Sequence, residues 1–518
     1  MFFTVDRSVK IQGSSIRIAM FSHIILLVCI SVQLLGVCEA QNTNLNSTSA
    51  VANTGNGLVT QGWTSGPNGR GTIDIIYSCG ITMFLCSWSV LCLNVPEPKC
   101  SRRRLFHRRL WITALAFLGP EFLFQIALGQ FLSARASVRQ FRESYLHTEK
   151  KKWLGWTIRH AFYADMGGFI LQSKRCPQSP EGWEKFPVDA KQIHYLLNEG
   201  YIEFPEVTQE EIRDKNKVDG VLRVFTVFQI VWFVVNMAGR RAQNLAITCG
   251  ELTTAAFIVC SFGTVLCWRC KPADVTTTVT IETEYTIAEI LRKAGDVARP
   301  PYNRTPLDFI SRKEWPWSIY WSNWINILRN LGIEFGPQKQ PVDRFENTYS
   351  LELPGSTKWI FFGVTAVYSS IFVTGWNYNF PTHAELILWR AAAGTMCACL
   401  VAYWAVTEFG FVWWPFLETR LRRNPKAGDL EKCSTPISVR SGWMKSKLKY
   451  AAACVRNNTI SQDPQFDAPL KAMLPIYVIG VFYCHARTYL FVADIIQLRS
   501  LPASAYDTVD WTKFVPHF

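Results

Sequence analysis

The sequence predicts an all-α polytopic membrane protein with about six to seven transmembrane or re-entrant helices and two cytoplasmic, membrane-associated segments. Seven long apolar segments follow an N-terminal leader, most of them near the ~20 residues that a helix needs to cross ~30 Å of hydrocarbon. Only 18% of the 518 residues are charged, below the ~25% usual in soluble proteins. Basic residues gather beside the apolar segments, as is typical of cytoplasmic loops.

Residues 1–40 have the features of a signal peptide. Basic residues precede an apolar run over Ile18–Val37, which is followed by the small residue Ala40. We expect cleavage after Ala40, and an uncleaved signal anchor is the alternative. The polar residues 41–71 then form a lumenal or extracellular tail, in which Asn46 begins a glycosylation sequon.

The apolar segments set the order of the membrane elements. They are Thr72–Val95, Leu110–Leu132, Gly220–Gly239, Ile247–Trp268, Thr357–Trp376, Leu386–Pro415 and Met473–Ile496. The first six form three predicted membrane hairpins, and the seventh is a single last span. The resulting divisions are hairpins over 72–132, 220–268 and 357–415, cytoplasmic segments over 133–219 and 269–356, a basic cytoplasmic loop over 416–472, a last span over 473–496 and a tail over 497–518.

The second apolar segment, Leu110–Leu132, is the ambiguous one. It contains Pro120 and has basic residues on both sides, which favours a re-entrant or in-plane helix that returns to the cytoplasm. The loop between Arg420 and Arg456 has ten Lys or Arg against two acids. Only the re-entrant topology, with six full spans and a lumenal C-terminus, places that loop inside. Seven full spans remain the alternative, which the short Arg240-Arg241 loop favours.

The two cytoplasmic segments contain signs of local structure. The alternating run Val275–Tyr285 predicts a strand, and a helix is expected over Ile287–Ala298. Thr208 and Glu211 have capping-box spacing. A set of aromatic residues at near-helical spacing predicts an interfacial helix lying on the bilayer, with a core aromatic stripe as the alternative. These residues are Trp315, Trp317, Tyr320, Trp321 and Trp324.

Ionisable residues inside apolar segments cost ~2.5–3.5 kcal/mol on insertion scales, so they are candidate functional groups. Five of them form the predicted intramembrane polar site: Glu121, Glu251, Glu408, His485 and Arg487. Glu121 follows Pro120, so a broken helix could present its carboxylate to freed backbone amides. If these groups converge, they form a proton-handling or ligand-binding site; if not, each makes a separate structural pairing.

The sequence indicates no metal site and no cofactor, because it has no nucleotide loop, zinc-ligand cluster or nucleophile triad. The net charge of +14 does not point to nucleic acid, since the basic residues adjoin apolar segments. The expected partners are membrane lipid and a lipophilic small molecule, and no protein partner is indicated. His160 and Asp165 form a weaker candidate for acid–base chemistry, because such pairs are commonly structural.

Several motifs resemble a fungal family of multi-pass integral membrane proteins of unknown molecular function. They are Trp63 with Gly66–Ile75, Pro120-Glu121-Phe122, His160–Gly168, Asp214–Gly220, Phe380-Pro381-Thr382 with Glu385 and Trp389-Arg390, and Leu498–Pro516. The resemblance spans roughly Trp63–Phe518 and is weakest in Pro272–Leu353. It implies a membrane location and a fungal source, but no mechanism and no catalytic residues.

The leading functional hypothesis is a non-catalytic membrane protein that binds, senses or moves a small lipophilic or ionic ligand between its helices. The alternative is a membrane-embedded enzyme of the cyclase, isomerase or hydrolase type that acts on a lipid-soluble metabolite. In that case Glu121, Glu251, Glu408 or His485 would be the acid–base groups. A membrane scaffold is a third hypothesis. The protein is expected to enter the secretory pathway, with endoplasmic reticulum, vacuole and plasma membrane all open.

Overall fold

The computed structural model describes the chain in several stretches: residues 60–66, 69–98, 100–148, 153, 155–174, 185–215, 220–298, 302, 304–311, 340–347, 357–413, 417 and 470–511. Four predictions therefore lie outside the described residues. These are the signal peptide, the glycosylation sequon at Asn46, the aromatic helix around Trp315–Trp324, and nearly all of the basic loop 416–472.

The described chain is mostly helical, which confirms the helical part of the predicted fold. Its main helices are α2 (Thr72–Trp88), α3 (Arg102–Leu118), α4 (Pro120–Thr148), α5 (Ile158–Asp165), α6 (Ala190–Asn198), α7 (Gln209–Asp214), α8 (Gly220–Ala242), α9 (Cys249–Trp268), α10 (Ile287–Ala294), α11 (Asp308–Ser311), α13 (Lys358–Thr374), α14 (His383–Thr407) and α17 (Leu470–Ile496). A π-helical turn, Glu408–Trp413, extends α14.

Three described helices are long and apolar enough to cross a membrane. They lie over Cys249–Trp268, His383–Gly410 and Leu474–Arg499. The pair α3 and α4 would add a fourth span if the two counted as one, and α2 and α13 are shorter apolar helices. The described part of the chain thus contains helices compatible with a membrane protein.

Helices α3 and α4 interrupt the predicted segment Leu110–Leu132 at Gly119. Their axes differ in direction by 112°. Pro120 has no backbone N–H and disfavours the α conformation in the residue before it. Gly119 accordingly adopts an extended conformation, with φ −155° and ψ 94°, and Pro120 begins the next helix, where a missing N–H costs nothing.

The prediction of an all-α fold was incomplete, because the chain also forms two small sheets. Strands β2 (Phe169–Ser173), β3 (Lys185–Val188) and β4 (Val279–Thr283) make a sheet in the order β3-β2-β4. β2 is antiparallel to β3 and parallel to β4, with Phe169 opposite Val279. Strands β1 (Thr60–Gln61) and β5 (Leu501–Pro502) join the two ends of the described chain.

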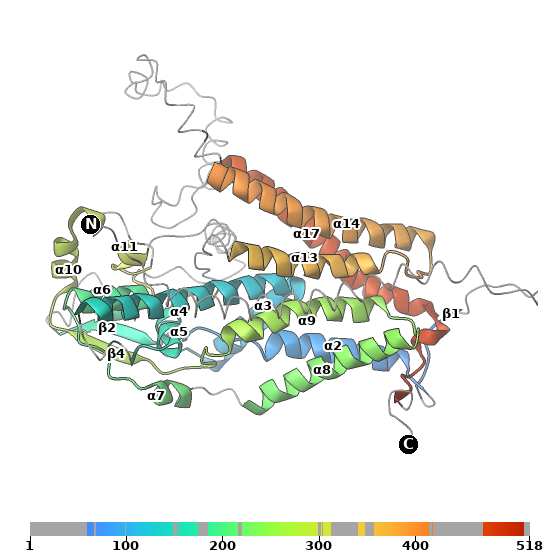
Figure 1. Cartoon of the computed structure of the whole chain (residues 1–518), viewed down its shortest axis with the longest axis horizontal. Coiled ribbons are helices and arrows are strands. Elements are labelled where there is room, and N and C mark those ends of the chain that lie inside the picture. Colours follow the sequence, from blue (N-terminus) through green and yellow to red (C-terminus); the bar gives the residue numbers. More distant parts are fainter. Residues whose placement is uncertain are drawn as a thin grey trace, which may run out of the picture.

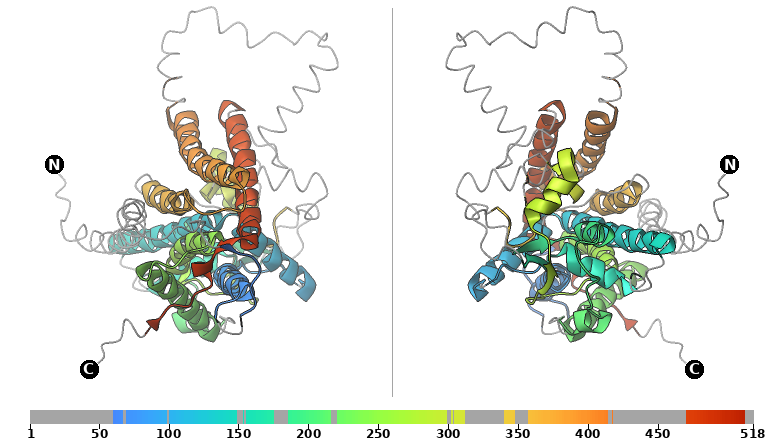
Figure 2. Two further views of the ribbon diagram at one scale, coloured as in Figure 1. Left: turned by 90° about the vertical axis from the view of Figure 1, so that its right-hand side faces the viewer. Right: turned by 90° about the vertical axis from the view of Figure 1, so that its left-hand side faces the viewer.

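The three-stranded sheet packs with α5, α6 and α10 at one end of the helix bundle, and this group is called the sheet unit below (Figure 1). One hydrophobic core runs through both parts, from Phe361 and Trp389 in the bundle to Phe169 and Ile193 in the sheet unit. Helix α9 packs against α2, α4, α13 and α17 and so lies at the centre of the bundle. Helices α14 and α17 project together beyond the others (Figure 2).

Gly119 tests how tightly the helix break is packed. A Cβ added there would lie 2.6 Å from the Phe122 ring and 2.9 Å from the Tyr483 hydroxyl. We expect Gly119→Ala to lower the free energy of unfolding by about 1–3 kcal/mol, because overpacking forces neighbouring groups to move. Thermal unfolding of the detergent-purified protein measures the change.

Gly394→Ala is the matched control, since a Cβ at Gly394 in α14 would meet no atom within 4 Å. That variant should be about 0.5–1 kcal/mol more stable than wild type, as expected for Gly to Ala in a helix interior. Equal stability of Gly119→Ala and wild type would contradict this expectation and show that the helix break has room for a methyl group.

Candidate functional site

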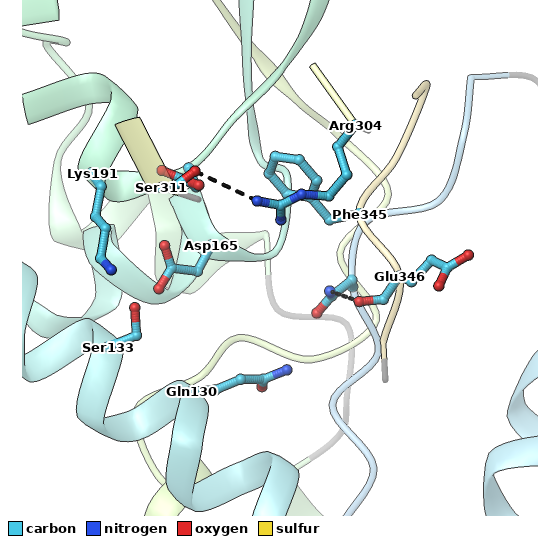
Figure 3. A pocket seen from close by; sticks show the side chains of 10 residues that line it. Gln130, Ser133, Asp165, Lys191, Arg304, Ser311, Phe345 and Glu346 are labelled. Carbon is cyan, nitrogen blue, oxygen red and sulfur yellow. Dashed lines mark hydrogen bonds between the residues drawn. The ribbon is translucent and has the colours of Figure 1, made fainter. Parts of the chain in front are cut away.

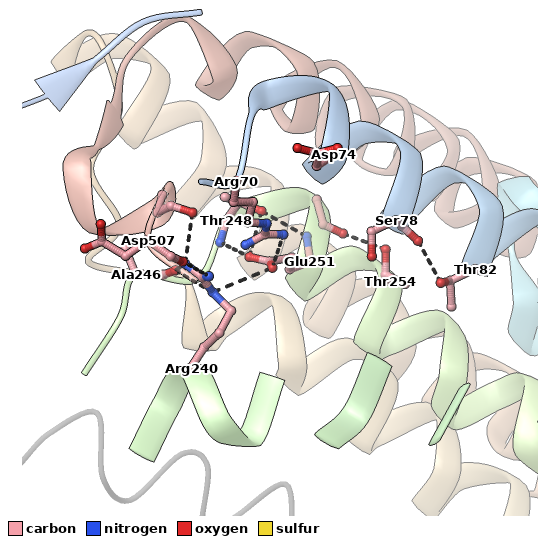
Figure 4. Close-up of polar contacts among 12 residues, drawn as sticks. Arg70, Asp74, Ser78, Thr82, Arg240, Ala246, Thr248, Glu251, Thr254 and Asp507 are labelled. Atoms are coloured by element: carbon pink, nitrogen blue, oxygen red, sulfur yellow. Dashed lines mark hydrogen bonds and ion pairs between the residues drawn. The ribbon is translucent and has the colours of Figure 1, made fainter. Parts of the chain in front are cut away.

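Glu251 does not lie in the predicted polar site, because it caps its own helix. It accepts a hydrogen bond from the Thr248 backbone N–H at 2.8 Å, and the Thr248 hydroxyl caps the Glu251 N–H in return. Its other oxygen pairs with Arg70 Nη2 at 2.6 Å (Figure 4). Glu251 is therefore a structural group at the end of α9 where the N-terminal segment arrives.

Arg240 joins three parts of the chain at the same end of the bundle. This fully buried guanidinium donates to the carbonyl oxygens of Ala246, Ser504, Ala505 and Asp507. Its Nε lies 3.8 Å from Glu251 Oε1 (Figure 4). The sequence analysis read Arg240 only as a loop charge, whereas it holds the α8–α9 turn to the C-terminal segment.

Two more of the predicted residues also lie apart from the rest. Glu408, where α14 passes into the π-helical turn, forms an ion pair with Lys358 Nζ at 2.5 Å, which ties that end of α14 to the start of α13. His485 is exposed on α17, and its Nδ1 is 2.8 Å from the Val481 carbonyl of its own helix. Neither residue reaches a shared site.

Glu121 and Arg487 do come together, at the break between α3 and α4. Glu121 is 6% exposed and Arg487 is fully buried. The Tyr483 hydroxyl, one turn before Arg487 on α17, donates a hydrogen bond to Glu121 Oε1. Arg487 Nε donates to the Leu118 carbonyl at 3.2 Å. The cation thus caps the C-terminal end of α3 and the carboxylate lies in the first turn of α4, the arrangement that both helix dipoles favour.

The guanidinium of Arg487 is surrounded by aromatic rings. Its Cζ lies 4.3 Å from the centre of Phe491, 5.1 Å from Phe372, 5.2 Å from Phe257 and 5.6 Å from Tyr368. Ring faces attract a cation by about 2 kcal/mol or more when water is excluded. Both Nη atoms nevertheless have no hydrogen-bond partner among the described residues.

A further buried acid of α17, Asp494, was not among the predicted residues. Its Oδ1 accepts a hydrogen bond from Thr253 of α9 at 3.0 Å, while its Oδ2 is buried without a described partner. Arg487 lies near both Asp494 and Glu121, although neither carboxylate pairs with its Nη atoms. The spacing of seven residues, two helical turns, puts Asp494 and Arg487 on one face of α17, and this was the available signal.

Further polar atoms around Arg487 are enclosed without partners. Within the described part of the chain these are Glu121 Oε2, both amide atoms of Gln125, and the Tyr368 hydroxyl. Gln125 follows Glu121 by one turn of α4. Unpaired buried polar groups are rare in folded proteins and commonly indicate bound water or an ion. The arrangement therefore has the hydrogen-bonding capacity of a site for a small polar species.

A separate polar pocket lies where the bundle meets the sheet unit (Figure 3). Its lining includes Gln130 and Ser133 of α4, Asp165 of α5, and Lys191 of α6. The enclosed space is about 20 Å³, room for about one water molecule. Asp165 is the residue whose Oδ2 is buried there without a described hydrogen-bond partner, and in Figure 3 the Ser133 hydroxyl lies beside it.

Charges in and beside this pocket are perturbed. Burial, followed by the charge of Asp189, raises the pKa of Asp165 to about 7. Lys271, next to the pocket, donates to Asn94 Oδ1 at 3.1 Å and Gln130 Oε1 at 2.8 Å. Burial lowers the pKa of Lys271 to about 8. Both pKa values lie near neutral pH, and shifts of this kind are common at functional sites.

The His160 and Asp165 pair is not an acid–base dyad. His160 Nδ1 lies 2.7 Å from the Thr157 hydroxyl, and its Nε2 lies 2.7 Å from the Val207 carbonyl. The imidazole therefore fixes the start of α5 to the loop before α7. Nor do the described residues contain a group of three or more His, Cys, Asp or Glu placed to hold a metal ion.

Comparison with known proteins gives one match. Residues 45–292 match the model of a family of unknown function, DUF8562. The matched range includes Glu121, α9 and nearly all of the sheet unit, ends within α10, and leaves out α13 and α17. No curated protein and no solved structure matches the chain. The family description assigns no activity, and the resemblance seen in the sequence also implied none.

Asp165 gives the pocket a pH-dependent stability. Its pKa rises from an ordinary 3.8 to about 7 on folding, so the folded state binds more protons than the unfolded state between these values. Stability must therefore fall as pH rises through this window, by at most about 4 kcal/mol. We expect Asp165→Asn to remove that part of the pH dependence.

The measurement is thermal unfolding of both proteins at a series of pH values from 4 to 8. The variant should gain stability relative to wild type as pH rises, with the difference levelling off above about 7. Ser101→Ala is the control, because it removes the hydroxyl that caps α3 at the Arg104 N–H and no titratable group, so its loss of stability should be the same at every pH. A constant difference between Asp165→Asn and wild type would contradict the assignment.

Proposed function

We propose that this chain is a multi-pass integral membrane protein that binds a small ion at the polar site formed by Glu121, Tyr483, Arg487 and Asp494. The observation that carries the proposal is a helix broken inside the bundle, with a buried cation at one broken end and a carboxylate at the other. Transporters present the ends of broken helices to ions in the same way.

The pattern of contacts favours the topology with six full spans and a re-entrant α3–α4 pair. Arg109 near the start of α3 pairs with Asp274 at 2.6 Å and donates to the Trp88 carbonyl at the end of α2. Gln130 of α4 meets Lys271 just after α9. The α3–α4 pair therefore begins and ends at the same end of the bundle, as a re-entrant element does.

On this topology the sheet unit is cytoplasmic, and the Arg70–Glu251 end of the bundle is lumenal or extracellular. The chain enters the membrane through the secretory pathway, led by its signal peptide. The basic loop 416–472 then lies on the cytoplasmic side, in agreement with the preference of Lys and Arg for that side.

An ion is a better ligand for the proposal than a lipid-soluble substrate. An enzyme of the kind considered above needs a cavity that holds two carboxylates and opens to lipid. The described pocket whose lining includes the acids Asp165, Asp189 and Glu346 lies instead at the sheet unit, and its volume is only about 20 Å³. The polar atoms around Arg487 are enclosed by side chains, which suits a species of atomic size.

Ion-dependent stability tests the proposal. A ligand that binds only the folded state stabilises it by about 2.7 kcal/mol at 100 times its dissociation constant. The unfolding temperature of wild type should therefore rise with one of four probes at constant ionic strength: sodium, potassium, chloride or inorganic phosphate. If the ion is a proton, the unfolding temperature should instead change with pH. The shift should disappear in Glu121→Gln.

Glu408→Gln serves as the control, because it removes a carboxylate that pairs with Lys358 outside the site. It should lower overall stability and leave the ion-dependent shift intact. A wild-type protein that responds to none of the probes, or a Glu121→Gln variant that responds as wild type does, would overturn the proposal.

A further inference from the structure

Helix α3 leaves the bundle sideways, at the end where the sheet unit lies. Its axis differs in direction from that of α4 by 112°, and α4 packs along α9, which is long enough to cross a membrane. In Figure 2, α3 accordingly projects from the side of the bundle. Arg109 of α3 contacts Trp88 at the end of α2 and Asp274 just after α9. Helix α3 therefore lies at the level where the membrane-length helices end.

The first half of α3 has more positive charge than its neighbours neutralise. Glu97 pairs with Arg104 at 2.6 Å and with Arg108 at 3.0 Å. Arg102 and Arg103 are exposed, and neither forms an ion pair with an acid in the part of the chain that the structure describes. Four arginines thus share one carboxylate, and the surface at the start of α3 is strongly basic.

These arginines do not stabilise α3 itself. The N-terminal end of a helix has a partial positive charge, so basic side chains in the first turn are unfavourable. Helix α3 has no acid in its first turn, and neighbouring arginines also repel one another. An anionic partner from outside the chain would remove both costs.

Exposed apolar side chains lie directly beside the arginines. Phe106 is 55% exposed, Leu110 48% and Trp111 46%. The ring of Phe106 lies 6.0 Å from that of Trp88, which in turn stacks on Phe84 at 5.6 Å. Aromatic rings of this kind concentrate where lipid headgroups meet acyl chains. We call the following residues the α3 patch: Arg102, Arg103, Phe106, Leu110 and Trp111.

The basic and the apolar residues of the α3 patch follow one another along the helix. Leu110 lies eight residues after Arg102, which is about 12 Å along the helix axis. The angle between α3 and α4 exceeds 90°, so α3 runs slightly away from the sheet unit, toward which α4 runs. In a bilayer the arginines would therefore lie at the level of the phosphates, and Leu110 and Trp111 would lie deeper, at the edge of the acyl chains.

We propose that α3 lies in the membrane interface and that Arg102 and Arg103 bind the anionic headgroups of phospholipids in the cytoplasmic leaflet. The apolar residues of the α3 patch enter the edge of the acyl-chain region. The inference rests on the membrane topology of the proposed function and is independent of the ion site. Since the last carbonyl of α3, that of Leu118, accepts a hydrogen bond from Arg487, lipid bound to α3 also holds one side of the helix break in place.

Lipid-dependent unfolding of the full-length protein tests this inference. The protein in a neutral detergent is titrated with phosphatidylserine, or with phosphatidylcholine as the lipid without net charge. The unfolding temperature of wild type should rise more with phosphatidylserine, and added salt should reduce the difference because it screens exposed charges. Arg102→Gln with Arg103→Gln should need about 25 times more phosphatidylserine for the same rise, since each arginine near a membrane surface contributes about fivefold.

Two further double variants serve as controls. Arg102→Lys with Arg103→Lys keeps the charge and should retain most of the response. Arg292→Gln with Lys293→Gln removes the same charge from exposed positions of α10 in the sheet unit, and it should respond as wild type does. Without phosphatidylserine, Arg102→Gln with Arg103→Gln should unfold at or slightly above the wild-type temperature, because it relieves repulsion at the start of α3.

The proposal is overturned if wild type responds equally to both lipids, if the glutamine variant of α3 responds as wild type does, or if the α10 control loses the response to the same extent. It is also overturned if inorganic phosphate reproduces the response through Arg102 and Arg103, because the α3 patch would then bind a soluble anion. Glu121→Gln should lose the ion response and retain the lipid response, so the two proposals can fail separately.

Discussion

Compensation of the buried charge of Arg487 is the constraint on which the membrane bundle depends. A guanidinium in a low-dielectric interior needs acceptors, counter-charge or polarisable rings, and the contacts of Arg487 are with the Leu118 carbonyl and four aromatic rings. The carbonyl is free because the helix stops at Gly119 instead of continuing past Pro120. The break therefore supplies a partner for the charge, and the charge satisfies the backbone that the break exposes.

The two ends of the bundle are held by different chemistry. At one end Arg240 gathers backbone carbonyls from the α8–α9 turn and the C-terminal segment, beside the Arg70–Glu251 pair. At the other, Lys271 contacts two neutral amides and carries a pKa of about 8, opposite Asp165 with a pKa of about 7. The first end is fixed at ordinary pH, whereas the second changes its charge near neutrality.

Local patterns in the sequence predicted the features that depend on neighbouring residues. Apolar segments indicated the long helices, and Pro120 indicated the broken one. The Thr208–Glu211 spacing indicated a capping box, which is present: the Glu211 N–H donates to the Thr208 hydroxyl at 3.1 Å, and the Thr208 N–H donates to the Glu211 carboxylate at 3.0 Å. Glu251 makes the separate structural pairing that was the alternative to a shared site, and Thr248 stands before it at the same capping-box spacing. The alternating run Val275–Tyr285 predicted β4, but its pairing with β2 could not be predicted because the two strands lie far apart in the chain. The bond of Asp494 to Thr253 likewise depends on the packing of α17 against α9.

The parallel pairing of β2 with β4 bears on how the protein is made. The two strands are separated in the chain by α6, α7, α8 and α9, and α9 is long and apolar enough to cross a membrane. On the ribosome, the central strand β2 is therefore complete while its neighbour β4 is still unsynthesised, and β3 covers only one of its two edges. An unpaired strand edge is prone to pair with other chains, and the sheet can close only after α8 and α9 have been synthesised.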